Sequence, residues 1–249
     1  MKKTIITISI FLLLLLLIPV TVLIYGFGTP SQFSLTYYGG LSVIYNKLER
    51  VQGKKIIIIG TSNIAFGVDS SMMEEQLKAS GLDYTVCNFG LYGALGTKIM
   101  LDLSKAHIGK GDIVLFAPEP YEQSMSMYFS ATEAWRAADA NFKILSRKAI
   151  ENRASMVGTF IGYTSSKLGY YFSGSPAQPS GVYASTSFDN NGDMKNADRK
   201  YNTMLDGYDR NYMVMLDKDI IDDEFIDYVN EYNDFVLKQG AVMYYSFAP

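Results

Sequence analysis

The sequence predicts an α/β protein, in which a parallel β-sheet has helices on both faces and follows a membrane-spanning helix. Three observations lead to this prediction. Segments with the composition of buried strands alternate with segments of helical periodicity, as is typical of parallel sheets. The first strand-like segment holds four consecutive isoleucines, which suits a strand buried on both faces. An apolar run at the N-terminus is long enough to cross a bilayer.

The first strand is expected at Lys54–Ile59, where the isoleucines are both β-branched and apolar. Gly60 permits a tight turn at the end of this strand. A polar loop that carries Ser62 then leads to a helix expected from Ser70 to Ser80, and the following Gly81 is suited to end that helix. This part of the chain is therefore predicted to form a strand, a loop and a helix.

The remainder of the domain is expected to repeat this unit. Strands are predicted at 84–88, 112–117 and 241–247, and helices at 94–107 and 218–239. Parallel strands end at one edge of their sheet, where α/β proteins bind their ligands. We expect four strand ends to meet there, carrying Ser62, the loop with Gly90 and Gly93, Glu119 and Pro249.

Residues 125–217 interrupt the alternating pattern and are interpreted as an insertion, or cap, beside the sheet. Residues 131–153 have a helical composition, whereas 162–192 are rich in Gly, Ser, Tyr, Asn and Pro and lack sustained periodicity. Disordered decoration is the alternative for such a composition. The many aromatic residues argue against complete disorder.

The apolar run from Thr4 to Tyr25 includes six consecutive leucines and would extend about 33 Å as a helix, enough to cross the hydrocarbon core. Lys2 and Lys3 favour an N-terminus in the cytoplasm, which places the remainder outside the membrane. A cleaved signal peptide is the alternative, but no Ala-x-Ala-like site follows the run. Pro19 can kink the helix without preventing insertion.

The chain is thus divided into a transmembrane anchor, a juxtamembrane connector and an α/β domain. The anchor spans 1–27, the connector spans 28–53 with a short helix at 41–51, and the domain spans 54–249 with the insertion at 125–217. The 249 residues suffice for one substantial domain and one membrane segment. The protein is expected to be a single-pass membrane protein with an extracytoplasmic domain.

The composition of the chain argues against several classes of function. A formal net charge of −3 gives no support for nucleic-acid binding, which usually needs a basic patch. Cys87 is the only cysteine, so no intrachain disulfide can form, and its apolar surroundings predict a buried, inert thiol. With His107 as the only histidine, a zinc site is not expected, and neither is a cofactor.

The polar residues at the predicted sheet edge are suited to acyl transfer. A serine nucleophile such as Ser62 needs a base and donors for an oxyanion, and the glycines of the loop 88–94 let backbone N–H groups approach a ligand. Glu119 is placed to orient a base or to bind a hydroxyl. Each feature also has a structural explanation: a polar loop serine without a reaction, a tight glycine turn, and a solvated loop acid.

These pieces resemble the SGNH/GDSL hydrolase superfamily, and in particular its membrane-anchored extracytoplasmic members, such as the D-alanyl-lipoteichoic acid and alginate-acetylation proteins. The resemblance covers roughly 54–122, with weaker support at 191–193 and 246–249. It implies a three-layer, flavodoxin-like α/β/α fold. The Gly-Asp-Ser block of the family is similar to Gly60-Thr61-Ser62-Asn63, which implies that Ser62 is the nucleophile.

The second block of the family supplies an oxyanion glycine, and the segment from Asn88 through Gly90 to Gly93 is similar to it, with Gly93 the better aligned glycine. The third block, Gly-x-Asn-Asp, contributes an Asn donor. Residues 118–122 occupy its place without an Asn, and they include the possible site-lining residues Glu119, Tyr121 and Glu122. The other residues expected to line the site are Gly60, Thr61, Asn63, Asn88 and Gly90.

The last block of the family, Asp-x-x-His, supplies the base, and this chain has nothing similar to it. His107 is expected at the opposite edge of the sheet from Ser62, as a core or surface residue. The resemblance therefore implies that the sequence is truncated at its C-terminus and inactive or nearly so as given.

Two functions of different classes are predicted. The first is a membrane-anchored serine esterase or acyltransferase that acts on acyl esters of cell-envelope glycans. The second is a non-catalytic protein that binds an envelope glycan or an assembly partner through the tyrosine-rich insertion, since aromatic faces suit sugar rings and protein partners alike. A soluble form released by signal cleavage is a third possibility.

Overall fold

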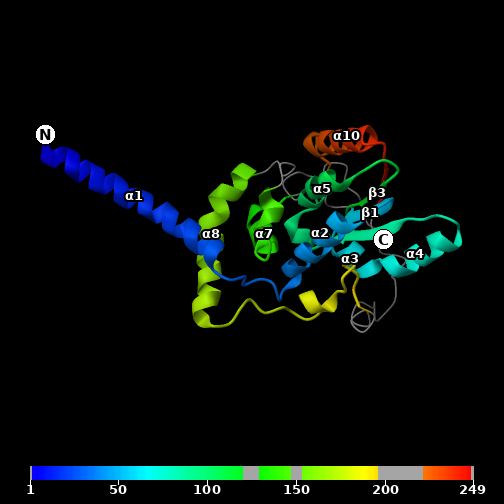
Figure 1. The fold of residues 1–249 in the computed structure, drawn as a ribbon, viewed down its shortest axis with the longest axis horizontal. Helices are drawn as coiled ribbons and strands as arrows, with labels where there is room; N and C mark the ends of the chain where they lie inside the picture. Colours follow the sequence, from blue (N-terminus) through cyan, green and yellow to red (C-terminus); the bar gives the residue numbers. More distant parts are fainter. Residues whose placement is uncertain (1, 120–128, 147–152, 196–220, 248–249) are drawn as a thin grey trace.

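The computed structural model describes residues 2–119, 129–146, 153–195 and 221–247 (Figure 1). In this part of the chain, four parallel strands form one sheet in the order β2-β1-β3-β4. The strands are β1 (Lys55–Gly60), β2 (Thr85–Gly90), β3 (Ile113–Ala117) and β4 (Val242–Tyr245). The predicted α/β class with a parallel sheet is confirmed.

One face of the sheet is covered by three helices, α2 (Gly40–Arg50), α5 (Lys98–Ser104) and α10 (Asp223–Lys238). Alternate strand residues such as Ile57, Phe89 and Phe116 point into this layer and are fully buried. The helix expected at 218–239 corresponds to α10, which begins at Asp223 because the Asp222 carboxylate accepts a hydrogen bond from the Phe225 N–H at 2.7 Å.

The opposite face is covered over β1 and β2 by α3 (Ser62–Gly67) and α4 (Ser70–Ala79). Ile56, Ile58 and Val86 are buried there. Within the described residues this layer does not extend to β4, where Val242 and Tyr244 remain 42% and 60% exposed. Helices therefore lie on both faces only over part of the sheet, and the complete three-layer arrangement remains a prediction.

Two local elements differ from the sequence prediction. The segment after Gly60 was expected to be a loop, but α3 begins at Ser62 because the Thr61 side chain accepts a hydrogen bond from the Asn63 N–H. The helix expected at 94–107 is divided into η2 (Gly93–Leu95), α5 and η3 (Lys105–His107). Gly96 separates η2 from α5 because its φ of +84° is incompatible with a right-handed helix.

The insertion is more helical than its composition indicated. It contains α7 (Ala131–Ala138), η4 (Phe142–Ser146), α8 (Arg153–Ser173) and η5 (Ser185–Ser187). The interpretation of 162–192 as lacking periodicity was wrong for its first twelve residues, which continue α8. In α8 a buried face with Met156, Phe160 and Tyr163 packs on α7, so tertiary packing overrides the glycines. Residues 125–128, 147–152 and 196–217 of the insertion lie outside the described residues.

The N-terminal helix α1 (Lys2–Gly28) projects from the rest of the domain in Figure 1. Residues Lys3–Gly28 form a helix that is long and apolar enough to cross a membrane. The last turn of α1 belongs to the domain, since the Phe27 ring contacts those of Trp135, Phe142 and Phe160 at centroid distances of 6.0, 4.9 and 4.9 Å. The predicted connector holds η1 (Tyr37–Gly39) and α2.

A buried ion pair joins α7 and α8 beside the end of α1. Lys167 is fully buried and its Nζ lies 2.8 Å from Asp139 Oδ1. The same ammonium donates to the Gly26 carbonyl oxygen at 3.1 Å. Asp139 also accepts hydrogen bonds from Ser31 Oγ at 2.7 Å and from the Gln32 N–H at 2.6 Å. Asp139 thus fixes the chain where it leaves α1, and such pairing offsets the desolvation of a buried charge.

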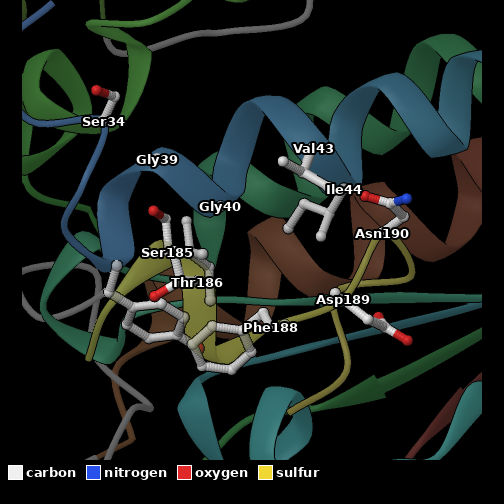
Figure 2. A pocket seen from close by; sticks show the side chains of 14 residues that line it. Ser34, Gly39, Gly40, Val43, Ile44, Ser185, Thr186, Phe188, Asp189 and Asn190 are labelled. Atoms are coloured by element: carbon white, nitrogen blue, oxygen red, sulfur yellow. The ribbon is translucent and has the colours of Figure 1, made fainter. Parts of the chain in front are cut away.

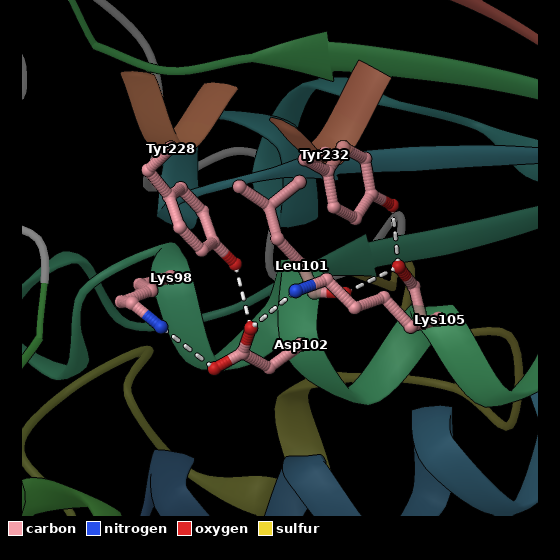
Figure 3. A network of polar contacts seen from close by, with 7 residues as sticks. Lys98, Leu101, Asp102, Lys105, Tyr228 and Tyr232 are labelled. Carbon is pink, nitrogen blue, oxygen red and sulfur yellow. Dashed lines mark hydrogen bonds and ion pairs between the residues drawn. The ribbon is translucent and has the colours of Figure 1, made fainter. Parts of the chain in front are cut away.

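A second buried polar network joins α5 to α10 (Figure 3). Asp102 lies 2.9 Å from Lys98 Nζ and 3.2 Å from Lys105 Nζ, and it accepts a hydrogen bond from Tyr228 at 2.6 Å. The Tyr232 and Ser104 hydroxyls are 2.5 Å apart. These groups sit among apolar neighbours, so the network positions α10 on the sheet by satisfying each buried charge.

Candidate functional site

The carboxyl ends of β1, β2 and β3 meet at one edge of the sheet, as the sequence predicted. Gly60 is paired in register with Gly90 on one side and with Ala117 on the other. The polar residues that follow each strand are therefore brought to a common edge. Ser62 stands there as the first residue of α3 and is partly exposed, whereas the next residue, Asn63, is exposed.

Thr61 and Glu119 join the ends of β1 and β3. The Thr61 hydroxyl donates a hydrogen bond to Glu119 Oε1. Both side chains are buried, with 1% and 6% exposure, so Glu119 is not a solvated loop acid. The hydroxyl oxygen of Thr61 also accepts from the Asn63 N–H at 3.4 Å. The contact with Glu119 therefore positions the residue directly before Ser62.

Two glycines allow α3 to approach the sheet. A Cβ added to Gly60 would lie 2.5 Å from the Ala117 carbonyl oxygen, and one added to Gly90 would lie 2.8 Å from the Thr61 carbonyl oxygen. No side chain fits at these distances, so both positions require glycine. The close approach is what sets Ser62 against the edge of the sheet.

Asn88 has a structural role in this arrangement. Its side-chain amide donates to the Ile64 carbonyl oxygen at 3.2 Å and to Asp193 at 2.9 Å, and its Oδ1 accepts from the Gly90 N–H at 3.1 Å. Asn88 is 1% exposed, and through these hydrogen bonds it joins β2 to α3 and to the predicted insertion. The Gly90 N–H is likewise occupied.

Asp193 is a residue whose importance the sequence did not reveal. Its carboxylate accepts from the Ser70 N–H at 2.7 Å, from Ser70 Oγ at 2.9 Å and from Asn88. It is 5% exposed and lies more than a hundred positions after these partners in the chain. The segment Asn191–Asp193 drew attention only as a weak family resemblance, and no local pattern signals such a distant contact.

Two backbone donors at the edge remain available to a ligand. Within the described part of the chain, neither the Ser62 N–H nor the Gly93 N–H has a hydrogen-bond acceptor. Ser62 is the first residue of α3 and Gly93 the first of η2, so both N–H groups precede the hydrogen-bonded turns of their elements. Donors of this kind can stabilise an oxyanion beside a serine.

The base expected for a serine nucleophile is not provided by His107. That imidazole lies 3.0 Å from the Tyr45 hydroxyl, and it precedes β3, at the edge of the sheet opposite to Ser62. Tyr121 and Glu122, which were predicted as possible site-lining residues, lie outside the described residues. Among the residues that the structure describes, no cluster of three His, Cys, Asp or Glu side chains could hold a metal ion.

Among the pockets of the described residues, two share Tyr37 of η1 and are also lined by residues of the predicted insertion. The first has a volume of about 230 Å³ and lies between α2 and the segment that follows η5 (Figure 2). Val43 and Ile44 line it from α2, and Ser185, Phe188 and Asp189 from the insertion. The pocket also contacts Gly90 and Leu91 at the end of β2, so it adjoins the edge of the sheet.

The second pocket is rich in tyrosines and has a volume of about 360 Å³. Its aromatic lining consists of Tyr37, Tyr38, Tyr92 and Tyr183. Tyr37 lines both pockets and is 4% exposed, and its hydroxyl has no hydrogen-bond partner within the described residues. Burial, and secondarily Tyr183, raise the pKa of Tyr37 well above its ordinary value, so this hydroxyl stays neutral.

Comparison with other proteins identifies no relative of this chain. No family model matches it, and neither a curated protein nor a solved structure does. The assignment of function therefore depends on the geometry of the sheet edge and of the adjoining pockets.

Proposed function

We propose that the protein is a membrane-anchored SGNH-like serine esterase or acyltransferase that acts on acyl esters of cell-envelope glycans. One observation carries the proposal: Ser62 lies one residue beyond Thr61 at the end of the inner strand β1, and its own N–H and the Gly93 N–H lack acceptors among the described residues. A nucleophile and two oxyanion donors at a sheet edge are the elements that acyl transfer requires.

In the proposed reaction, Ser62 Oγ attacks the carbonyl carbon of the ester, and the Ser62 and Gly93 N–H groups bind the oxygen that becomes negative. The ester C–O bond then breaks and the alcohol leaves with the proton of the serine. Water or a sugar hydroxyl subsequently removes the acyl group from Ser62. The acceptor that reaches this intermediate determines whether the result is hydrolysis or transfer.

The base is the part of this mechanism that the chain does not supply in the usual form. The 249 residues contain one histidine, which lies at the other edge of the sheet. A histidine base would have to come from a segment or a protein beyond these residues. We expect the isolated chain to react slowly, because an unactivated serine is a weak nucleophile at its free pKa.

The proposed location is a membrane crossed by α1, with Lys2 and Lys3 in the cytoplasm and the α/β domain outside. The packing of Phe27 and the hydrogen bond from Lys167 to Gly26 support a retained anchor rather than a cleaved signal peptide. Cleavage after these residues would remove Phe27 and leave the aromatic cluster without one of its rings.

The test is covalent labelling of the full-length protein in its native membrane with a fluorophosphonate probe. We expect one adduct, located on Ser62 by mass spectrometry, that is lost in Ser62→Ala and kept in Ser80→Ala, a change of an exposed serine on α4's C-terminal side. Folding of each variant is checked by the fluorescence of Trp135. Absence of labelling in a folded protein would reject Ser62 as a nucleophile.

A non-catalytic role in binding an envelope glycan is the second candidate, and the tyrosine-lined pocket favours it. The pocket is lined by four tyrosines, and aromatic faces of this kind suit the rings of a sugar. An envelope-assembly protein is the alternative partner of the same surface. This role needs neither a base nor a reactive Ser62.

Titration with soluble envelope polysaccharides, followed by calorimetry, separates the two candidates. For a glycan-binding protein we expect Tyr183→Ala to weaken binding at least tenfold, while Ser62→Ala and Tyr244→Ala, which alters an exposed ring on β4, leave it unchanged. Equal binding by Tyr183→Ala and the unaltered protein would exclude this pocket as the glycan site.

A further inference from the structure

After its first residue, Arg153, α8 has a single charged residue. Between Arg153 and Asp189 the only charged residue of the sequence is Lys167, which is fully buried and paired with Asp139. On the exposed side of α8, Val157, Ile161 and Phe172 are 73%, 64% and 75% exposed. Three large exposed apolar side chains on one helix, with no charged residue between Arg153 and the buried Lys167, mark a surface that is suited to an apolar partner.

These apolar side chains lie on the face of α8 that also meets α1. Thr164 defines that face, because a Cβ added to Gly26 of α1 would lie 2.6 Å from Thr164 Oγ1. Val157 and Ile161 precede Thr164 by seven and three positions, so they share its side of the helix. The adjoining side of α8 carries small residues, including Gly158 and Gly162.

The contacts between α8 and α1 fix where α8 lies along the axis of α1. The Lys167 ammonium donates to the Gly26 carbonyl oxygen at 3.1 Å, and the rings of Phe27 and Phe160 stack at a centroid distance of 4.9 Å. Figure 1 shows α8 running across the end of α1 rather than alongside it. Gly26 directly follows the apolar run that ends at Tyr25, so these contacts lie at the level where α1 would leave the hydrocarbon core.

We propose that α8 is an interfacial helix that lies in the phospholipid headgroup region, with Val157, Ile161 and Phe172 inserted at the boundary with the acyl chains. Exposed aromatic rings gather at the same level, Tyr25 and Phe27 on α1 and Tyr171 on α8, as in the aromatic belts of membrane proteins. The lipid surface thereby holds the domain against the membrane. This inference rests on α1 spanning the membrane.

The proposal is tested with full-length protein in phosphatidylcholine vesicles whose acyl chains carry bromine. Single cysteines at positions 14, 161, 162, 172 and 82 are labelled with a fluorophore that bromine quenches. The native Cys87 stays unlabelled, because it is 2% exposed and burial raises the pKa of its thiol to about 11. Trp135 fluorescence confirms that each variant is folded.

We expect bromine to quench the label in Leu14→Cys, Ile161→Cys and Phe172→Cys, but not in Leu82→Cys, whose position is exposed in the turn after α4. Gly162→Cys is the matched control on α8, since a Cβ at Gly162 meets no other atom within 4 Å. We expect at least threefold weaker quenching there than at position 161.

Three results would overturn the proposal. If the label at position 14 is quenched and those at 161 and 172 are not, α1 spans the membrane while α8 stays in water. If position 14 is not quenched either, the premise that α1 spans the membrane fails, and the proposal fails with it. Protection of position 161 from a water-soluble quencher without bromine quenching would assign its surface to a protein, such as a second copy of this chain.

Discussion

Replacing Lys167 with methionine removes the ammonium that joins α7, α8 and the end of α1. Lys167 is fully buried, and its Nζ lies 2.8 Å from Asp139 Oδ1 and 3.1 Å from the Gly26 carbonyl oxygen. Methionine fills a similar volume without the charge. The substitution therefore leaves the Asp139 carboxylate buried, at 4% exposure, without its counter-ion.

Breaking a buried ion pair by removing one partner costs about 3–5 kcal/mol. We expect about 3 kcal/mol for Lys167→Met, at the lower end, because Asp139 keeps its hydrogen bonds from Ser31, from the Gln32 N–H and from the Tyr163 hydroxyl. For a domain of this size, that loss lowers Tm by about 6–12 °C. In a double-mutant cycle with Asp139→Asn, the double variant should lose about 1–3 kcal/mol less stability than the sum of the losses in the two single variants.

The same pair predicts how stability depends on pH. Burial by itself raises the pKa of Asp139, but hydrogen bonds from Lys167, Tyr163 and Ser31 outweigh it and lower the pKa below its ordinary value. A carboxyl whose pKa is lower in the folded state stabilises the protein above its unfolded pKa, about 3.9, and this contribution disappears as the pH falls through the folded value. Lys167→Met removes the largest of the interactions that lower this pKa, so we expect a smaller loss of stability over the same acidic range.

Trp135 provides the assay for these changes. It is the only tryptophan, it is 9% exposed, and its ring stacks on that of Tyr163 at a centroid distance of 5.6 Å, so its fluorescence reports the packing around the ion pair. Thermal unfolding of the full-length protein is followed in detergent micelles. Lys78→Met, a change of an exposed lysine on α4, is the control and should alter stability by about 0.5 kcal/mol at most. If Lys167→Met shifts Tm no more than this control, the ion pair does not stabilise the domain.

Three further predictions concern the sheet. Gly60→Ala should destabilise the protein by about 1–3 kcal/mol in urea unfolding, because the added Cβ would lie 2.5 Å from the last carbonyl oxygen of β3. Gly67→Ala, whose Cβ would meet no atom within 4 Å, should cost less than 1 kcal/mol, and equal losses in the two variants would contradict the steric argument. Asp193→Ala should cost about 3 kcal/mol of stability and speed proteolysis of the segment around it, since three hydrogen bonds to the carboxylate are lost, whereas Asp227→Ala on the exposed face of α10 should do neither. If the Asp193→Ala protein resists proteolysis as well as the unaltered protein, the proposed role of this carboxylate is refuted. Cys87, with a thiol pKa raised to about 11 by burial, should not react with iodoacetamide at pH 8 until the protein unfolds, as judged by intact mass; rapid alkylation of the native protein would show that β2 is not buried as described.

Much of the fold follows from local sequence patterns. The isoleucine run of β1, the apolar segments of β2 and β3, and the amphipathic α10 each contain enough periodic or continuous apolar residues to predict an element and its type. The meeting of Gly60, Gly90 and Glu119 at one edge also follows, because the carboxyl ends of parallel strands share an edge. The residues at the candidate site were therefore largely predictable as neighbours.

Their roles were less predictable. Asn88 was expected to line the site, yet its amide is bonded to Ile64 and to Asp193, which lies 105 positions later in the chain. Glu119 was open to interpretation as a solvated acid, but it is buried against Thr61. The residue type indicates what a side chain can bond to, while only the assembled fold brings a particular partner within reach.

The sequence by itself determined the α/β class, the apolar helix at the N-terminus and the position of Ser62 after a buried strand, because each depends on consecutive residues. Only the tertiary structure decided the strand order β2-β1-β3-β4, the start of α3 at Ser62, and the closure of Lys167 and Asp139 around the end of α1. The closure of Lys167 and Asp139 shows the physical reason most directly. A buried polar group must be paired, and where its partner is distant in the chain, the pairing depends on which elements pack together.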